Sequence, residues 1–175
     1  MEPFRPKRTG VSPAIDQVLV HNRAYAQGYS LQGLSAPPAK RIAMVGCMDA
    51  RINPVTSLGL AYGDAHILRN AGAVVTPDVH RSLIVSTQKL GVREIMVIGH
   101  TKCGMMGFDG ADFRSQLEEK YGPHPYAPPE FYTFADLALN VQRQVKIVHD
   151  CPWIHPEAVV RGFVFDVDTG ALAEI

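Results

Sequence analysis

The chain has 175 residues, and its 17 Lys and Arg side chains balance its 17 Asp and Glu side chains. With 46% hydrophobic and 19% charged residues, the composition is typical of one globular domain and excludes a wholly disordered chain. The charge balance argues against nucleic-acid binding, which usually needs a basic surface. No apolar run approaches the roughly 20 residues of a membrane helix, and no secretory signal follows the basic segment Met1–Gly10. We therefore expect a cytoplasmic protein that binds neither nucleic acid nor a membrane.

Residues 1–40 are expected to form a helical arm in front of the main domain, 41–175. Ser12 followed by Pro13 is typical of a helix N-terminus, and Gly28 and Gly33 are expected to weaken and end that helix. Apolar residues recur at helical spacing between these positions, which predicts an apolar face. The sequence leaves open whether this face packs on its own domain or on a neighbouring subunit.

Strands and helices alternate along the main domain. Short apolar runs predict three buried strands, at Ile42–Val45, Ala65–Leu68 and Ile95–Ile98. A capping residue followed by proline, at Asn53–Pro54 and at Thr76–Pro77, predicts a helix after each of the first two strands. This alternation predicts an α/β fold, in which parallel strands are joined by right-handed crossovers and helices cover the sheet.

The last third of the chain is predicted to hold two helices and a final strand. A polar helix is expected over Ala111–Tyr121, followed by an irregular Pro-rich stretch over Gly122–Pro129. Thr133 is expected to cap a second helix, whose apolar stripe begins at Phe134. An alternating apolar pattern from Phe163 onward predicts a terminal strand or hairpin.

Two segments that directly follow the first and third predicted strands contain residues able to bind a metal. The first, Cys47–Arg51, reads C-M-D-A-R, and the second, His100–Cys103, reads H-T-K-C. Because the carboxyl ends of parallel strands meet at one edge of a sheet, both segments should open onto that edge. The segment Arg69–Gly72, after the second strand, is expected there too.

Cys47, His100 and Cys103 are predicted to bind one Zn²⁺ ion. Thiolate and imidazole are donors that zinc prefers, and three protein ligands leave a tetrahedral ion with one open position, as in catalytic zinc sites. A single cysteine is more often a buried apolar residue, so the prediction depends on the two segments meeting. Cys151 has no partner at ligand spacing and is expected to be structural.

Asp49 and Arg51 follow Cys47 at alternate positions, so all three side chains share one face if the chain is extended there. Beside a zinc ion, Asp49 could be a fourth ligand, or it could orient a zinc-bound hydroxide. Arg51 can hold Asp49 away from the metal through a bidentate ion pair; an ordinary surface ion pair is the simpler alternative. Because two thiolates donate charge to the metal, we expect activity to rise toward alkaline pH.

These residues resemble those of the β-class carbonic anhydrases. The resemblance rests on the C-x-D-x-R and H-x-x-C motifs and extends over most of 41–175, and the short length is similar to the compact microbial branch, which also includes carbonyl sulfide hydrolases. It implies Zn²⁺ bound by the two cysteines and the histidine, with Asp49 and Arg51 as the catalytic dyad. It also implies a mostly parallel sheet with an added antiparallel strand near the C-terminus, and a homodimer or homotetramer with active sites near the subunit interface.

The expected reaction is the reversible hydration of carbon dioxide to bicarbonate and a proton. The alternative is a hydrolase of carbonyl sulfide or carbon disulfide that uses the same zinc-hydroxide site, because the metal ligands do not distinguish these linear electrophiles. A closed structural zinc module, with Asp49 as fourth ligand, and a nucleotide-binding protein are rivals from other classes. The proton shuttle is left open, with six histidines as candidates by pKa alone: His21, His66, His80, His124, His149 and His155.

Overall fold

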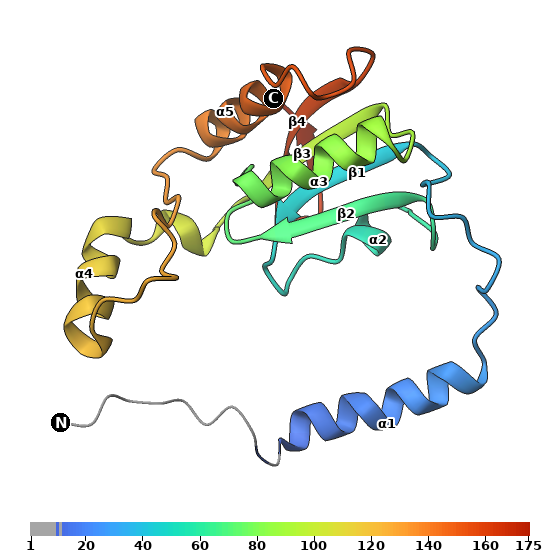
Figure 1. Cartoon of the computed structure of the whole chain (residues 1–175), viewed down its shortest axis with the longest axis horizontal. Coiled ribbons are helices and arrows are strands. Elements are labelled where there is room, and N and C mark those ends of the chain that lie inside the picture. The colour runs from blue at the N-terminus through green and yellow to red at the C-terminus, as the bar shows by residue number, and fades with distance from the viewer. Residues whose placement is uncertain (1–9, 11) are drawn as a thin grey trace.

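A computed structural model describes Gly10 and residues 12–175, and its centre is a five-stranded sheet in the order β2-β1-β3-β4-β5 (Figure 1). The strands are β1 (Ile42–Cys47), β2 (Ala65–Asn70), β3 (Glu94–His100), β4 (Val159–Phe165) and β5 (Leu172–Glu174). The first four strands are parallel, and β5 pairs antiparallel with β4. The predicted α/β fold is therefore confirmed, including the antiparallel strand near the C-terminus. Apart from Gly10, the basic N-terminal segment lies outside the described residues.

Helices connect the strands where the capping residues predict them. Over the described residues they are α1 (Pro13–Gln27), α2 (Pro54–Ser57), α3 (Pro77–Gln88), α4 (Gly110–Tyr121) and α5 (Leu137–His149), with a 3-10 turn at Gly104–Met106. The side chain of Asn53 accepts a hydrogen bond from the backbone N–H of Thr56 at 3.3 Å, and that of Thr76 accepts one from Val79 at 3.4 Å. Each bond satisfies a backbone donor that the first turn of a helix leaves free.

Two helices, α3 and α5, cover the same face of the sheet. Ala43 and Val45 of β1 point to this face, where they form one cluster with Leu83 of α3 and Val148 of α5. Met44 points to the opposite face and packs there with side chains of β3 and β4. β1 is thus buried on both sides, which explains why its sequence is a continuous apolar run rather than an alternating one.

The last helix begins later than the sequence predicts, so the assignment of Thr133 as its cap is wrong. Asp136 is the capping residue, and its carboxylate accepts a hydrogen bond from the backbone N–H of Leu139 at 2.9 Å. Phe134 lies before the helix instead of on its apolar stripe, and it packs against the buried cluster of Cys47, Ala73 and Cys103. Threonine and aspartate are both good helix caps. The packing of Phe134 leaves Thr133 outside the helix, and Asp136 takes the capping position.

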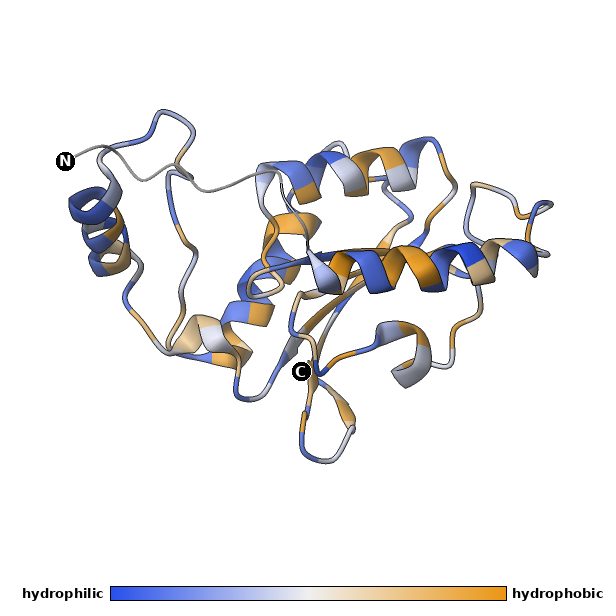
Figure 2. Cartoon of the chain, turned by 90° about the horizontal axis from the view of Figure 1, so that it is seen from below, coloured by the Kyte–Doolittle hydropathy of each residue, from blue (hydrophilic) through white to orange (hydrophobic). Residues whose placement is uncertain are grey.

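The helix α1 lies apart from the sheet, at the end of a long connection (Figure 1). It ends at Gln27, with Gly28 at its C-terminus as predicted, but none of its residues is buried. Figure 2 shows hydrophobic residues between hydrophilic ones along this helix, and Ile15, Val18 and Leu19 are at least half exposed. The apolar face of α1 therefore does not pack on its own domain. None of the described helices combines the length and hydropathy needed to cross a membrane.

Candidate metal centre

The ends of the parallel strands bring the two predicted segments together. Cys47, the last residue of β1, lies opposite Asn70 at the end of β2. His100, the last residue of β3, lies opposite Phe165 at the end of β4. Cys103 follows three residues after His100, just before the 3-10 turn. The predicted convergence at one sheet edge is therefore found.

Cys47, His100 and Cys103 form a compact buried cluster. One possible ligand atom from each residue lies within 4.8 Å of those of the other two, and the two Sγ atoms are 4.0 Å apart. Their exposed fractions are 6%, 1% and 5%. Three such donors could hold one metal ion between them. Cys151, the remaining cysteine, is half-buried and does not belong to this cluster.

One nitrogen of His100 is buried and finds no hydrogen-bond partner among the residues that the structure describes. The other nitrogen, Nδ1, donates to the backbone oxygen of Thr101 at 2.9 Å. A carbonyl oxygen only accepts, so this bond places the proton of a neutral ring on Nδ1 and leaves a lone pair on Nε2. Nε2 is buried without a partner, which is costly for a polar atom in a protein core. A metal ion bound at Nε2 would remove that cost.

The two thiols of the cluster share one hydrogen bond, which separates their pKa values. Donation from Cys103 lowers the pKa of Cys47, and the same bond, together with burial, raises the pKa of Cys103. Two thiolates this close repel one another unless a cation lies between them. Two sulfur donors and one imidazole nitrogen are a ligand set that suits zinc. The residues present therefore fit a zinc ion.

Asp49 and Arg51 form the bidentate pair that their spacing predicts. Arg51 Nε donates to Asp49 Oδ1 at 2.9 Å and Arg51 Nη2 donates to Oδ2 at 2.8 Å. This guanidinium holds the pKa of the Asp49 carboxyl well below its usual range. Oδ2 of Asp49 also lies 3.8 Å from Nε2 of His100. An ionised acceptor therefore lies beside the cluster of Cys47, His100 and Cys103.

Most of the chain that builds this site matches a known enzyme family. A family model described as carbonic anhydrase matches residues 42–172, and β-carbonic anhydrase 1 of Mycobacterium tuberculosis is 42% identical over 160 residues, which cover 91% of this chain and 96% of that protein. The chain belongs to the β-carbonic anhydrase family. The solved carbonic anhydrase of Streptococcus mutans matches this β-carbonic anhydrase fold with a TM-score of 0.86 at 38% identity, covering 95% of this chain and 99% of the other.

The β-carbonic anhydrase family also contains relatives named for another reaction. A carbon disulfide hydrolase of Saccharolobus solfataricus is 32% identical to this chain over 169 residues, covering 83% of each protein. The resemblance seen in the sequence is confirmed, and the relatives include both carbonic anhydrases and carbon disulfide hydrolases.

Two further residues support this β-carbonic anhydrase site, and sequence reasoning assigned no role to either. Arg69 of β2 donates to the backbone oxygens of Cys47 and Asp49, each at 2.7 Å. The backbone oxygen of Lys102 accepts a hydrogen bond from Arg51 Nη2 at 3.0 Å. The pairing of β1 with β2 could have indicated Arg69, because it places the arginine beside the end of β1. No residue pattern indicates the contact at Lys102, because it is made by the backbone.

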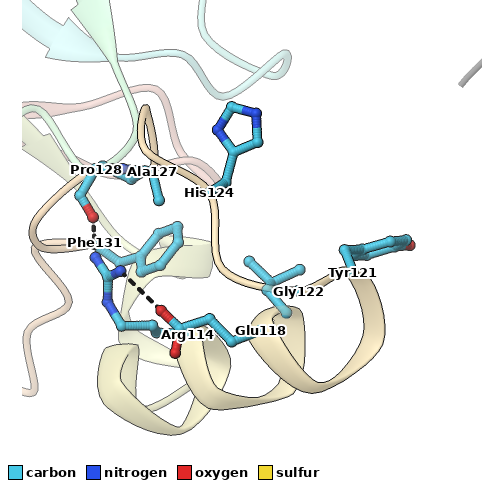
Figure 3. A pocket seen from close by; sticks show the side chains of 9 residues that line it. Arg114, Glu118, Tyr121, Gly122, His124, Ala127, Pro128 and Phe131 are labelled. Atoms are coloured by element: carbon cyan, nitrogen blue, oxygen red, sulfur yellow. Dashed lines mark hydrogen bonds and ion pairs between the residues drawn. The ribbon is translucent and has the colours of Figure 1, made fainter. Parts of the chain in front are cut away.

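The wall of the site is apolar. Ala73, Met105 and Phe134 pack against the two cysteines. A different apolar cavity, of about 360 Å³, lies between α4 and the Pro-rich stretch and contains none of the cluster residues. Figure 3 shows Arg114 there, between the carboxylate of Glu118 and the backbone oxygen of Pro128. Apolar packing and the three possible metal donors thus meet at the sheet edge rather than in that cavity.

Proposed function

We propose that this chain catalyses the reversible hydration of carbon dioxide to bicarbonate and a proton, with a Zn²⁺ ion held by Cys47, His100 and Cys103. The observation that carries the proposal is the buried, unpartnered Nε2 atom of His100, which belongs to the same compact cluster as two sulfur atoms. Membership in the β-carbonic anhydrase family supports the same reaction.

The surroundings of His100 and Cys47 favour metal binding at these two proposed ligands. Zinc supplies Lewis-acid chemistry when bound, because it lowers the pKa of solvent in an open position and makes it a nucleophile. Two thiolates and a neutral imidazole would balance the charge of a divalent ion. Thr101 holds the His100 ring in the tautomer that a ligand needs, and Arg69 anchors the backbone of Cys47.

We assign Asp49 and Arg51 as the catalytic dyad. Arg51 donates two hydrogen bonds to Oδ1 of Asp49, from its backbone N–H and from Nε, and one to Oδ2 from Nη2, so it keeps the carboxylate ionised and turned away from ligation. A carboxylate oxygen has a second lone pair, and Asp49 Oδ2 lies beside the cluster. A solvent molecule at the cluster can donate a hydrogen bond to Oδ2, which orients the oxygen that attacks the substrate.

The apolar wall suits a substrate without polar hydrogen. The side chains of Ala73, Met105 and Phe134 offer no hydrogen-bond donor, and the thioether sulfur of Met105 is only a weak acceptor. They therefore present an apolar surface on the cysteine side of the cluster, which suits a small apolar substrate better than a polar one. Bicarbonate carries a charge that this wall does not stabilise, which favours release of the product.

Hydrolysis of carbon disulfide or carbonyl sulfide is the second candidate. It is favoured by the relative named carbon disulfide hydrolase at 32% identity, and the same residues would serve it. A closed structural module with Asp49 as fourth ligand is less well supported, because Arg51 already binds both oxygens of that carboxylate.

Stopped-flow hydration of carbon dioxide by the zinc-loaded protein tests the proposal, with sulfide release from carbonyl sulfide and carbon disulfide measured in parallel. We expect hydration that rises between pH 6.5 and pH 9, because two thiolates make the metal a weaker acid than three imidazoles do. A flat profile over this range would contradict the ligand argument. A zinc-replete protein that neither hydrates carbon dioxide at pH 9 nor releases sulfide would favour the structural module.

We also propose that α1 packs on a second copy of the chain, in a homodimer or homotetramer. On this view residues 1–40 are an arm and 41–175 the catalytic domain. The support is that α1 buries none of its residues although it carries an apolar face. A cytoplasmic location remains a prediction.

A further inference from the structure

The backbone of Lys102 adopts a conformation that lysine rarely takes. Its φ angle is 55°, which lies in the left-handed region that glycine, asparagine and aspartate enter far more readily than other residues. Such a conformation persists only where the surrounding structure forces it. Lys102 lies between His100 and Cys103, the two proposed ligands of the second segment.

Hydrogen bonds hold the chain on both sides of Lys102. The backbone N–H of Thr101 donates to the oxygen of Phe165 at 3.0 Å, and its hydroxyl accepts from the N–H of Val167 at 3.0 Å. On the other side, the oxygen of Cys103 accepts from the N–H of Met106 at 3.1 Å. Because Thr101 is tied to the end of β4 and Cys103 begins a new turn, the chain changes direction at the single residue between them.

The bend directs the backbone oxygen of Lys102 to the dyad. That oxygen accepts a hydrogen bond from Arg51 Nη2 at 3.0 Å, and the same nitrogen donates to Asp49 Oδ2 at 2.8 Å. The side chain of Arg51 is 48% exposed, so solvent competes for its donors. The Lys102 oxygen therefore links the guanidinium to the second segment of the site.

The charged end of Lys102 does not explain its conformation. Its ammonium pairs with Asp168 Oδ2 at 2.6 Å, but the two side chains are 63% and 59% exposed. Exposed ion pairs of this kind contribute little to stability. The contact with Arg51 depends only on the direction of the Lys102 backbone oxygen. A residue without a positive charge could therefore make the same contact.

We propose that Lys102 is a positioning residue for the reaction: its left-handed backbone holds Arg51 and, through Arg51, sets the carboxylate of Asp49 against the Cys47–His100–Cys103 cluster. The inference rests on the proposed function and adds a residue outside the ligands and the dyad. The backbone conformation of Lys102 is what positions the dyad on this proposal, and the charge of its side chain is not needed.

Two substitutions distinguish the backbone from the charge. Lys102→Asn and Lys102→Val both remove the ammonium, but asparagine tolerates the left-handed conformation and the β-branched valine resists it. Asp168→Asn removes the ion pair alone.

For zinc-loaded proteins we expect Lys102→Val to lower kcat by at least about tenfold, since small displacements of positioning groups have large effects on rate. KM and zinc content should stay near those of the parent protein. We expect Lys102→Asn and Asp168→Asn to keep most of kcat.

A second measurement does not depend on turnover. The ¹H–¹⁵N signal of Arg51 Nε, assigned through its absence in Arg51→Lys, reports the bond to Asp49. We expect the same signal in the parent protein and in Lys102→Asn, and a shift toward that of a solvent-exposed arginine in Lys102→Val. If Lys102→Val does not fold, Lys102→Ala replaces it, because alanine also disfavours left-handed backbone but is smaller.

Three results would overturn the inference. Equal activity of the asparagine and valine variants, with an unmoved Arg51 signal, would show that the bend is not needed. An equal loss in both would assign the effect to the ammonium. Loss of zinc from the valine variant alone would mean that the bend serves the ligands. A parent protein inactive on all three substrates would refute the proposed function, while the Arg51 signal would still test the contact.

Discussion

Nε2 of His100 and Oδ2 of Asp49 face one another at 3.8 Å. Each atom carries a lone pair, because the proton of a neutral His100 ring is on Nδ1 and Arg51 keeps Asp49 ionised. Two acceptors at this distance do not stabilise one another. Only a cation or a hydrogen-bond donor placed between the two atoms can stabilise them. A metal ion would supply the cation, and a solvent molecule on that ion would supply the donor.

Removing one proposed ligand should remove the metal. We expect Cys47→Ala to lose Zn²⁺ and with it turnover, because two remaining ligands bind zinc far more weakly than three. The matched control is Cys151→Ala, which removes a cysteine outside the cluster and should retain one zinc per chain. Metal content is measured by atomic emission after gel filtration. Full zinc retention in Cys47→Ala would refute the assignment of this ligand.

Removing the dyad carboxylate should separate metal binding from turnover. We expect Asp49→Ala to keep its zinc and to lose kcat by about 100-fold, the size of effect typical of a positioned proton acceptor. Asp78→Ala is a fair control, because Asp78 also pairs with an arginine, Arg81, but on the exposed surface of α3. Stopped-flow hydration measures both variants. Zinc loss from Asp49→Ala would indicate that the carboxylate is a ligand instead.

The turn between β4 and β5 should make stability depend on pH. Asp166 accepts hydrogen bonds from the backbone N–H groups of Thr169 at 2.8 Å and Asp168 at 2.9 Å, and these bonds lower its pKa. A carboxylate with a lowered folded-state pKa stabilises the fold above its unfolded-state pKa, about 3.9, and this stabilisation is lost as pH falls through the folded-state value. We therefore expect Asp166→Asn to be less stable than the parent protein at pH 6, with a difference that shrinks below about pH 4. Urea unfolding measures it, and a constant difference would argue against the assigned cause.

Gly99 should be required for the packing of α5 on β3. A Cβ atom at this position would lie 2.6 Å from Val141 Cγ2 and 2.8 Å from Leu137 Cδ1. We expect Gly99→Ala to lower the free energy of unfolding by about 1–3 kcal/mol, the usual cost of overpacking a core. Gly33→Ala is the control, because a Cβ there meets nothing within 4 Å. Thermal unfolding of the two zinc-loaded variants compares them, and equal midpoints would show that α5 shifts freely.

The apolar face of α1 should hold subunits together. Leu19 is half exposed on this helix, and an aspartate there costs little in a monomer but is unfavourable in a buried interface. We expect Leu19→Asp to shift the protein to smaller species in light scattering coupled to gel filtration. Gln17→Asp adds the same charge on the opposite side of the helix and should leave the assembly intact. A parent protein that is already monomeric would refute this role for α1.

Much of the fold follows from local chemistry that a sequence displays. Asn53 and Thr76 begin helices because their side chains satisfy free backbone donors next to a proline. The run Ile42–Val45 is apolar on both faces because helices and loops cover both faces of β1. Alternation of such elements permits essentially one handedness of connection, so the meeting of Cys47 with His100 could be predicted from topology alone.

Other features depend on contacts between residues distant in the sequence. The choice of Asp136 over Thr133 as a helix cap followed from the packing of Phe134 on the cysteines. The support that Arg69 gives to the backbone of Asp49, and the left-handed bend at Lys102, involve carbonyl groups that every residue carries. Residue identity therefore determined the secondary-structure elements and the proposed ligand set of this protein. The tertiary structure alone decided how the dyad is held, because backbone groups acquire direction only when the chain is folded.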